Sequence, residues 1–332
     1  MQDRYAGDVG DYGKIALLRF LQAQGFSIGV NWYRVAEMDS EKNADGSYKQ
    51  NDGKYLISEK LRECDPTLAD HLMRIAHSKR RSISSIQKAD LIPGAVYFDT
   101  PLSVESRSEW HQKAMDKLAE ADLVFMDPDN GLKVKSVGKR SAKSIKYAFY
   151  EEVKDYIDAG KSVLIYNHRC RKPEKEYFDD IEKMLQDEVK VYWAVIQAIT
   201  FPKGSIRDYF AIPACEEHAK LIKKAFVEMS ESIWGQLGVC KLHPEWAKDI
   251  PLHYMTYDDH IFMEIESETF NKACSFEQYK RDIIRYLMHS SWHYSEKTAK
   301  AIVKNEMEYI QKSFKKKDTI ADVAVEIGYG CG

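Results

Sequence analysis

The chain has 332 residues, of which 44% are hydrophobic and 30% charged, so it is long enough for one large domain or two smaller ones and should bury a sizeable core. Its 49 Lys and Arg nearly balance its 52 Asp and Glu, which excludes a protein coated in positive charge but is compatible with a local basic face. Because no apolar run could span a bilayer and no apolar signal core stands at the start, we expect a soluble, cytoplasmic protein with no membrane partner.

The first helix is predicted to begin at Asp11 as its N-cap and to end at Gly25, because apolar residues recur between them at helical spacing. A buried strand is expected over 26–35, followed by a polar loop over 36–51. Residues 54–92 are predicted to be mainly helical.

Strands and helices alternate from Pro93 onward. Strands are predicted over 95–99, 121–127 and 162–166, and helices over 103–118, 145–157 and 174–186. The strand over 121–127 is apolar almost throughout, as in a parallel sheet that is covered on both faces. The strands over 189–199 and 207–212 are separated by a segment too short for a crossover helix and should pair antiparallel. The sequence therefore predicts a doubly wound, mostly parallel α/β sheet that ends in an antiparallel strand.

Three segments are expected in all. An α/β domain spans 1–216, a helix and aromatic-rich connector spans 217–274, and a small module of three helices spans 275–332. The second helix of this three-helix module is predicted to run from the N-cap Ser295 through Phe314. This helical module is either an independent unit for a protein partner or a lid on the sheet.

Polar residues follow two of the predicted strands. Asp127-Pro128-Asp129-Asn130 follows the strand over 121–127, and His168 follows the strand over 162–166. In an open parallel sheet, ligands bind at the carboxyl ends of the strands. These five residues are therefore the predicted catalytic set, able to bind a metal, an amine or a ribose, although polar residues are common at any strand end.

Two basic clusters flank the same strand ends. Such clusters hold phosphate backbones, and a solvated loop is the alternative. The predicted nucleic-acid-binding residues are Lys133, Lys135, Lys139, Arg140, Lys143, Arg169 and Arg171.

A run rich in glycine and aspartate, Tyr5–Lys14, precedes the first helix. The first turn of a helix exposes backbone N–H groups that can hold an anion, whereas glycines at this place are often only tight turns. The predicted cofactor-binding residues are Gly7, Asp8, Asp11 and Lys14.

In these motifs the first ~215 residues resemble Rossmann-like methyltransferases, in particular the adenine-N6 methyltransferases that act on 23S rRNA. That family begins with a run of the form HAGNxADVLKHxxL, where this chain has YAGDVGDYGKIALL. It carries DPPY after its fourth strand, where this chain has DPDN. The resemblance implies an S-adenosylmethionine cofactor enclosed by the N-terminal run, and a target amine that donates hydrogen bonds to Asp127 and to the carbonyl of Pro128, with help from Asn130.

Two motifs differ from that family. The stacking aromatic residue of DPPY is replaced, and the turn after the first strand, NWYRVAEMD, lacks the glycine-rich loop. Trp32 or Tyr33 could stack on a ligand there, and Glu37 or Asp39 could bind a ribose.

Three hypotheses follow from the sequence. The first is a divergent methyltransferase acting on amino groups of nucleic acid. The second is a phosphoester hydrolase or nuclease dependent on Mg²⁺ or Mn²⁺, with Asp127 and Asp129 as ligands and His168 as base or ligand. The third is a non-catalytic module that binds nucleic acid or protein.

Overall fold

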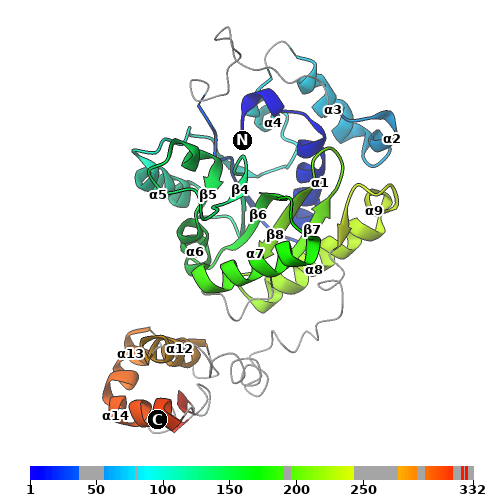
Figure 1. The fold of residues 1–332 in the computed structure, drawn as a ribbon. Coiled ribbons are helices and arrows are strands. Elements are labelled where there is room, and N and C mark those ends of the chain that lie inside the picture. Colours follow the sequence, from blue (N-terminus) through cyan, green and yellow to red (C-terminus); the bar gives the residue numbers. More distant parts are fainter. Residues whose placement is uncertain are drawn as a thin grey trace. The chain divides into compact units, whose positions relative to one another are not determined.

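The computed structural model describes residues 1–36, 56–78, 81–189, 196–242, 276–289, 296–316, 323–324 and 326–327. The chain divides into two compact units, which we call the first unit (Met1–Lys248) and the second unit (Asp249–Gly332). The first unit is built on a seven-stranded sheet with helices on both faces (Figure 1).

The strands of this sheet lie in the order β2-β1-β3-β6-β8-β7-β9. The first four are parallel to one another, and β8 is antiparallel to both of its neighbours. The predicted α/β sheet and the antiparallel pairing of its last two predicted strands are confirmed. The strands are β1 (Ile28–Asn31), β2 (Val96–Phe98), β3 (Leu123–Met126), β6 (Ser162–His168), β7 (Gln197–Phe201), β8 (Arg207–Ile212) and β9 (Lys241–Leu242).

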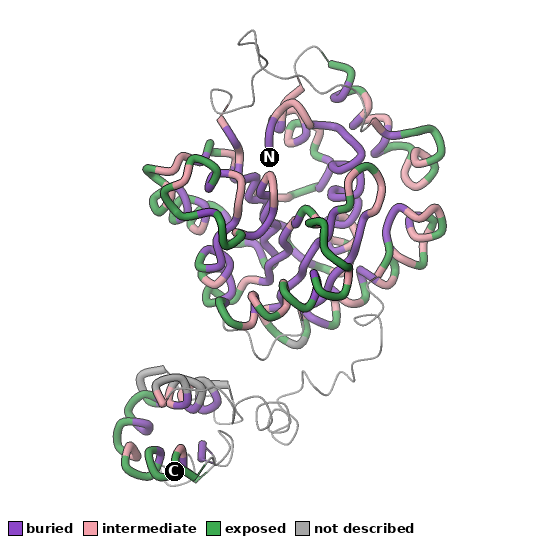
Figure 2. The backbone as a smooth tube through the Cα atoms, in the orientation of Figure 1, coloured by how far each residue is buried: buried purple, intermediate pink, exposed green. Residues whose placement is uncertain are grey.

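Two apolar cores cover the two faces of the sheet. Successive side chains of a strand point to opposite faces, so that Phe125 and Leu164 enter one core and Val124 and Val163 enter the other. Both cores are buried (Figure 2). The first core is covered by α1 (Val9–Ala23), α3 (Pro66–Ala76), α4 (Ile83–Lys88) and α8 (Glu216–Glu231), and the second by α5 (Arg107–Lys117), α6 (Tyr150–Asp158) and α7 (Glu174–Val189).

Three predicted helix starts are wrong. Helix α5 begins at Arg107 rather than at Ser103. Helix α1 begins at Val9 with Asp8 as its N-cap, not at Asp11, because the Asp8 carboxylate accepts the first free N–H groups. Helix α6 begins only at Tyr150. The residues before it form a 3-10 helix (Ala142–Lys146) and the strand β5 (Tyr147–Ala148), which pairs with β4 (Gly131–Leu132).

The division between the units lies after Lys248, so α8 belongs to the first unit rather than to a connector. Its buried side chains, Ile222 and Phe226 among them, are part of the first core. The short helices α2 (Glu59–Arg62) and α9 (Ile233–Gln236) and the 3-10 helix η1 (Asp3–Tyr5) complete this unit. Residues 243–275, most of the predicted connector, lie outside the described residues.

The second unit contains α12 (Phe276–His289), α13 (Glu296–Asn305) and α14 (Met307–Lys316). The single helix predicted from Ser295 to Phe314 is in fact two helices, because a turn at Glu306 interrupts it. Ser295 lies outside the described residues. Ile302 and Ile310, on either side of the break, share one core with Ile283. None of the helices that the structure describes, in either unit, is long and apolar enough to cross a membrane.

Candidate functional site

A polar pocket of about 290 Å³ lies at the carboxyl ends of β3 and β6. Its wall combines the N-terminal segment, the start of α1, the turn after β3 and the edge formed by β6 and β8. All five predicted catalytic residues and three of the four predicted cofactor residues line it. These are Asp127, Pro128, Asp129, Asn130 and His168 on one side, and Asp8, Asp11 and Lys14 on the other.

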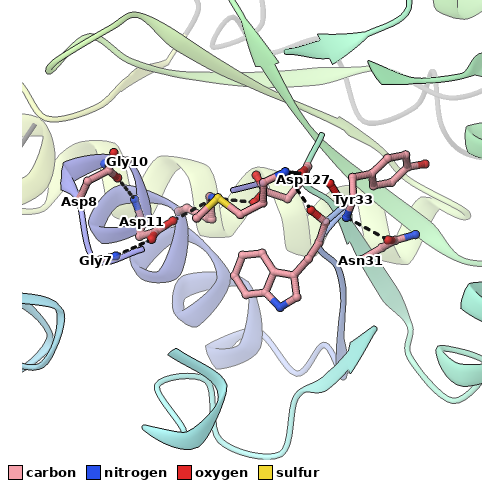
Figure 3. A network of polar contacts seen from close by, with 10 residues as sticks. Gly7, Asp8, Gly10, Asp11, Asn31, Tyr33 and Asp127 are labelled. Atoms are coloured by element: carbon pink, nitrogen blue, oxygen red, sulfur yellow. Dashed lines mark hydrogen bonds and ion pairs between the residues drawn. The ribbon is translucent and has the colours of Figure 1, made fainter. Parts of the chain in front are cut away.

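The backbone amides at the start of α1 are already engaged. The Asp8 Oδ1 atom accepts hydrogen bonds from the N–H groups of Gly10 (2.7 Å) and Asp11 (3.0 Å), and Asp11 Oδ2 accepts from Gly7 (2.8 Å), as Figure 3 shows. The amides of Gly7, Gly10 and Asp11 are therefore not free to hold an anion. Asp8, Gly10 and Asp11 all line the pocket.

Gly7 is the predicted cofactor residue that does not line the pocket. Its φ is +85°, and a Cβ atom there would lie 2.5 Å from the carbonyl oxygen of Leu72 in α3. Glycine is needed for this close approach of the N-terminal segment to α3. Its role is structural.

Lys14 joins the two sides of the site. Its ammonium lies 2.7 Å from Asp127 Oδ2 and 3.0 Å from Asp11 Oδ1, and all three side chains are buried. Burial alone would lower the pKa of Lys14, but the two carboxylates more than offset that effect and raise it. The lysine is therefore positively charged, and it also lies against the ring of Trp32.

Asp129 is held by a second set of contacts. Its Oδ2 atom accepts a hydrogen bond from Gln2 Nε2 at 2.7 Å and lies 3.4 Å from the Lys146 ammonium. Burial raises the pKa of Asp129, but the Met1 ammonium, Lys146 and the hydrogen bond from Gln2 together bring the pKa below its usual value. Asp129 is therefore a carboxylate at neutral pH.

The turn that carries Asp127–Asn130 is fixed by β6. Gly131 has a φ of +107°, and a Cβ atom there would lie 1.9 Å from Asn167 Oδ1. That oxygen accepts a hydrogen bond from the Leu132 N–H at 2.7 Å, while Asn167 Nδ2 donates to the hydroxyl of Tyr177 at 2.6 Å. The glycine thus lets the turn approach β6. Asn130 then lies beside His168, whose backbone N–H donates a hydrogen bond to the Asn130 carbonyl.

Arg207, the first residue of β8, also lines the pocket. It is 7% exposed, and its Nη1 atom donates to the carbonyl oxygens of Lys203 and Ser205. Burial and the nearby Asp11 raise the pKa of Asp8 to about 6, although Arg207 lowers it. Burial and Arg207 lower the pKa of His168, which is therefore neutral at pH 7.

Sequence reasoning missed Gln2, Tyr166 and Arg207. Arg207 could have been found, because it begins the predicted antiparallel strand, and the start of that strand lies beside His168, as the register confirms. Tyr166 lies within the predicted strand over 162–166, whose pattern does not tell which of its side chains reaches the pocket. No motif or periodicity points to Gln2.

The residues predicted to bind nucleic acid do not line the pocket. Lys135, Lys139, Arg140, Lys143 and Arg171 are exposed, Lys133 is half-buried, and Lys139 pairs with Glu151 at 2.9 Å.

Arg169 differs from the expectation. Its side chain is only 8% exposed, and its guanidinium is paired with Asp208 at 2.5 Å and also with Glu174. It holds the end of β6 to β8 rather than presenting charge to a phosphate.

The residues do not fit the predicted metal site. Asp127 faces the Lys14 ammonium and Asp129 faces that of Lys146, so each carboxylate is already paired with a cation. Within the described ranges, no group of three or more His, Cys, Asp or Glu side chains could hold a metal ion.

The aromatic residues after β1 do not line the pocket either. Tyr33 is buried and donates its hydroxyl proton to Glu152 at 2.9 Å, and Trp32 is 1% exposed. Glu37 and Asp39, the predicted ribose ligands, lie outside the described residues.

No protein-family model, no curated protein and no solved structure matches this chain.

Proposed function

We propose that this protein is a methyltransferase that uses S-adenosylmethionine and acts on amino groups of nucleic-acid bases. The observation that carries the proposal is one pocket between the two segments on which the family resemblance rests. The run from Asp8 to Lys14 forms one wall, and the turn from Asp127 to Asn130 forms the opposite wall. The pocket also lies at the carboxyl ends of parallel strands, where open α/β sheets bind their ligands.

The charges of the pocket suit the amino-acid end of the cofactor, which carries a carboxylate and an ammonium group. Asp8 and Arg207 both line the pocket, and they offer an acceptor for the ammonium and a donor for the carboxylate. When bound, the cofactor supplies a methyl group on a positively charged sulfur. The volume, about 290 Å³, lies just below the ~300–1,000 Å³ typical of small-molecule sites.

The turn after β3 provides hydrogen-bond acceptors for the target amine. Methyl transfer forms an N–C bond while the C–S bond breaks, with its electron pair staying on sulfur, and the amine then releases a proton to water. Carboxylate and carbonyl oxygens fixed near the nitrogen stabilise the positive charge that develops on it. A rigid turn, held by Gly131 and Asn167, keeps these oxygens in place.

In this proposal the exposed basic residues bind the phosphates of the nucleic acid. Lys135, Arg140 and Lys143 lie on the chain between the turn and α6 and are exposed. Each phosphate that they neutralise adds affinity that declines with salt.

Calorimetric titration with S-adenosylmethionine tests the proposal. We expect saturable binding to the full chain that Arg207→Met weakens by tenfold or more. The matched control is Arg171→Met, which changes an exposed arginine outside the pocket and should bind as the unaltered protein does. If millimolar cofactor produced no binding heat, the proposal would be refuted, and nucleic-acid binding without cofactor binding would favour a non-catalytic module.

A further inference from the structure

Gln2 carries an acceptor that no described residue satisfies. Its Nε2 atom donates to Asp129 Oδ2 at 2.7 Å, which fixes the orientation of the amide. The other end, Oε1, is buried and has no hydrogen-bond partner among the described residues. Gln2 is 2% exposed and lines the pocket. Because a buried acceptor without a donor is costly, this oxygen is suited to a donor that a ligand brings.

Asp129 provides a second acceptor beside it. The side chain lines the pocket, and its pKa is lowered, so that it is a carboxylate at neutral pH. Gln2 and Asp129, which are hydrogen-bonded to each other and both line the pocket, therefore contribute an amide oxygen and a carboxylate to it. Two such acceptors match the two N–H bonds of a primary amino group.

Asp127 is less suited to this role than its place in the motif suggests. Its Oδ2 atom lies 2.7 Å from the Lys14 ammonium, which neutralises much of its charge because both side chains are largely buried. The ion pair between Asp129 and Lys146 is longer, at 3.4 Å, and more exposed. Of the two carboxylates, Asp129 is thus the one that keeps more capacity for a ligand.

We infer that Gln2 and Asp129, rather than Asp127, receive the amino group of the target base. The inference rests on the proposed function and identifies the part of the pocket that recognises the substrate. It also accounts for DPDN, because the carboxylate that replaces the second proline of DPPY takes the acceptor role while Asp127 is bound to Lys14.

The test compares two single-stranded RNA oligonucleotides that are identical except for one base, adenine in one and unsubstituted purine in the other. Fluorescence anisotropy gives the Kd of each for the full chain. We expect the unaltered protein to bind the adenine oligonucleotide about tenfold more tightly, as for one hydrogen bond to a charged group. Gln2→Leu and Asp129→Asn should each reduce that preference below about threefold, while the Kd for the purine oligonucleotide stays constant.

Gln112→Leu is the matched control, since Gln112 is exposed and its Nε2 atom also donates to a carboxylate, that of Asp116. An unchanged Kd for the purine oligonucleotide shows that each variant is folded. The inference is overturned if both pocket variants keep the preference for adenine, or if the unaltered protein has none. Titration of the same proteins with S-adenosylmethionine reports separately on the proposed function.

Discussion

Lys14 and Asp127 are 113 residues apart in the chain and form an ion pair of 2.7 Å between side chains that are 5% and 3% exposed. The pair joins the first helix to the end of β3, at the centre of the sheet. Taking two charges out of water is favourable only when each is matched by its partner. The pocket wall and the fold therefore depend on the same contact.

Replacing Lys14 by methionine should destabilise the protein. The change leaves Asp127 and Asp11 buried without their shared cation, and breaking a buried ion pair from one side costs about 3–5 kcal/mol. Urea unfolding measures the loss. Lys113→Met is the control, because Lys113 pairs with Glu109 on the surface and such pairs contribute less than about 1 kcal/mol. Equal effects of the two substitutions would contradict this account of the pair.

The pKa of Asp8 predicts a pH dependence of stability. Because its folded-state pKa, about 6, exceeds the ordinary value of 3.8, the folded state binds the proton more tightly than the unfolded state does. The stabilisation is complete below pH ~4 and is lost as pH rises through ~6.

Asp8→Asn removes this titration and keeps the Oδ1 acceptor for the start of α1. Relative to the unaltered protein, the variant should therefore gain up to about 3 kcal/mol of stability between pH 4 and pH 7.5. Urea unfolding at both pH values measures the difference. A difference that is the same at pH 4 and pH 7.5 would show that Asp8 titrates normally.

Gly131→Ala should disrupt the turn of the site. The new Cβ would meet Asn167 Oδ1, and the φ of +107° disfavours any side chain. Strain and overpacking together should cost about 2–5 kcal/mol. Gly94→Ala separates the two effects, because Gly94 also has a positive φ, +74°, but open space around it. If the two variants unfold at the same urea concentration, the close approach to Asn167 has no energetic weight.

The exposed basic residues should set the salt dependence of nucleic-acid binding. The triple variant Lys135→Glu, Arg140→Glu, Lys143→Glu should weaken binding of single-stranded RNA and reduce the slope of log K against log[salt] by about 0.7 for each lost phosphate contact. Lys113→Glu, Lys117→Glu, Lys183→Glu makes the same charge change at exposed positions on α5 and α7. Equal losses in both triple variants would mean that only net charge matters.

The sequence predicted the sheet well, because alternation of apolar strands and amphipathic helices is local information. The strand over 207–212 was correctly expected to be antiparallel, since the short segment before it excludes a crossover. The start of α1 was placed too late because Asp8 and Asp11 are equally good N-caps by residue type. Gly10 and Gly13 also weaken the helical pattern there, and Gly13 is required by its close contact with Phe201.

The candidate site was predicted only in part, because local sequence patterns reveal the ends of strands but not the partners of their side chains. Asp127, Asp129, Asn130 and His168 follow from strand ends, which the sequence reveals, and they do line one pocket. The side-chain partners depend on long-range packing, which it does not reveal. Arg169 is of a residue type that often binds phosphate, but it is paired with Asp208, which lies 39 residues further along the chain. Gln2 reaches Asp129 across 127 residues, and no local pattern indicates it.

Methyl transfer itself tests the central claim most directly. The full chain is incubated with S-adenosylmethionine carrying a radioactive methyl group and with RNA, and the digested nucleosides are then separated. The account predicts label on a nucleoside that bears an exocyclic amino group, and its loss in Asp129→Asn but not in Gln112→Leu. RNA that binds the protein yet carries no label, at cofactor concentrations that saturate the pocket, would contradict the account.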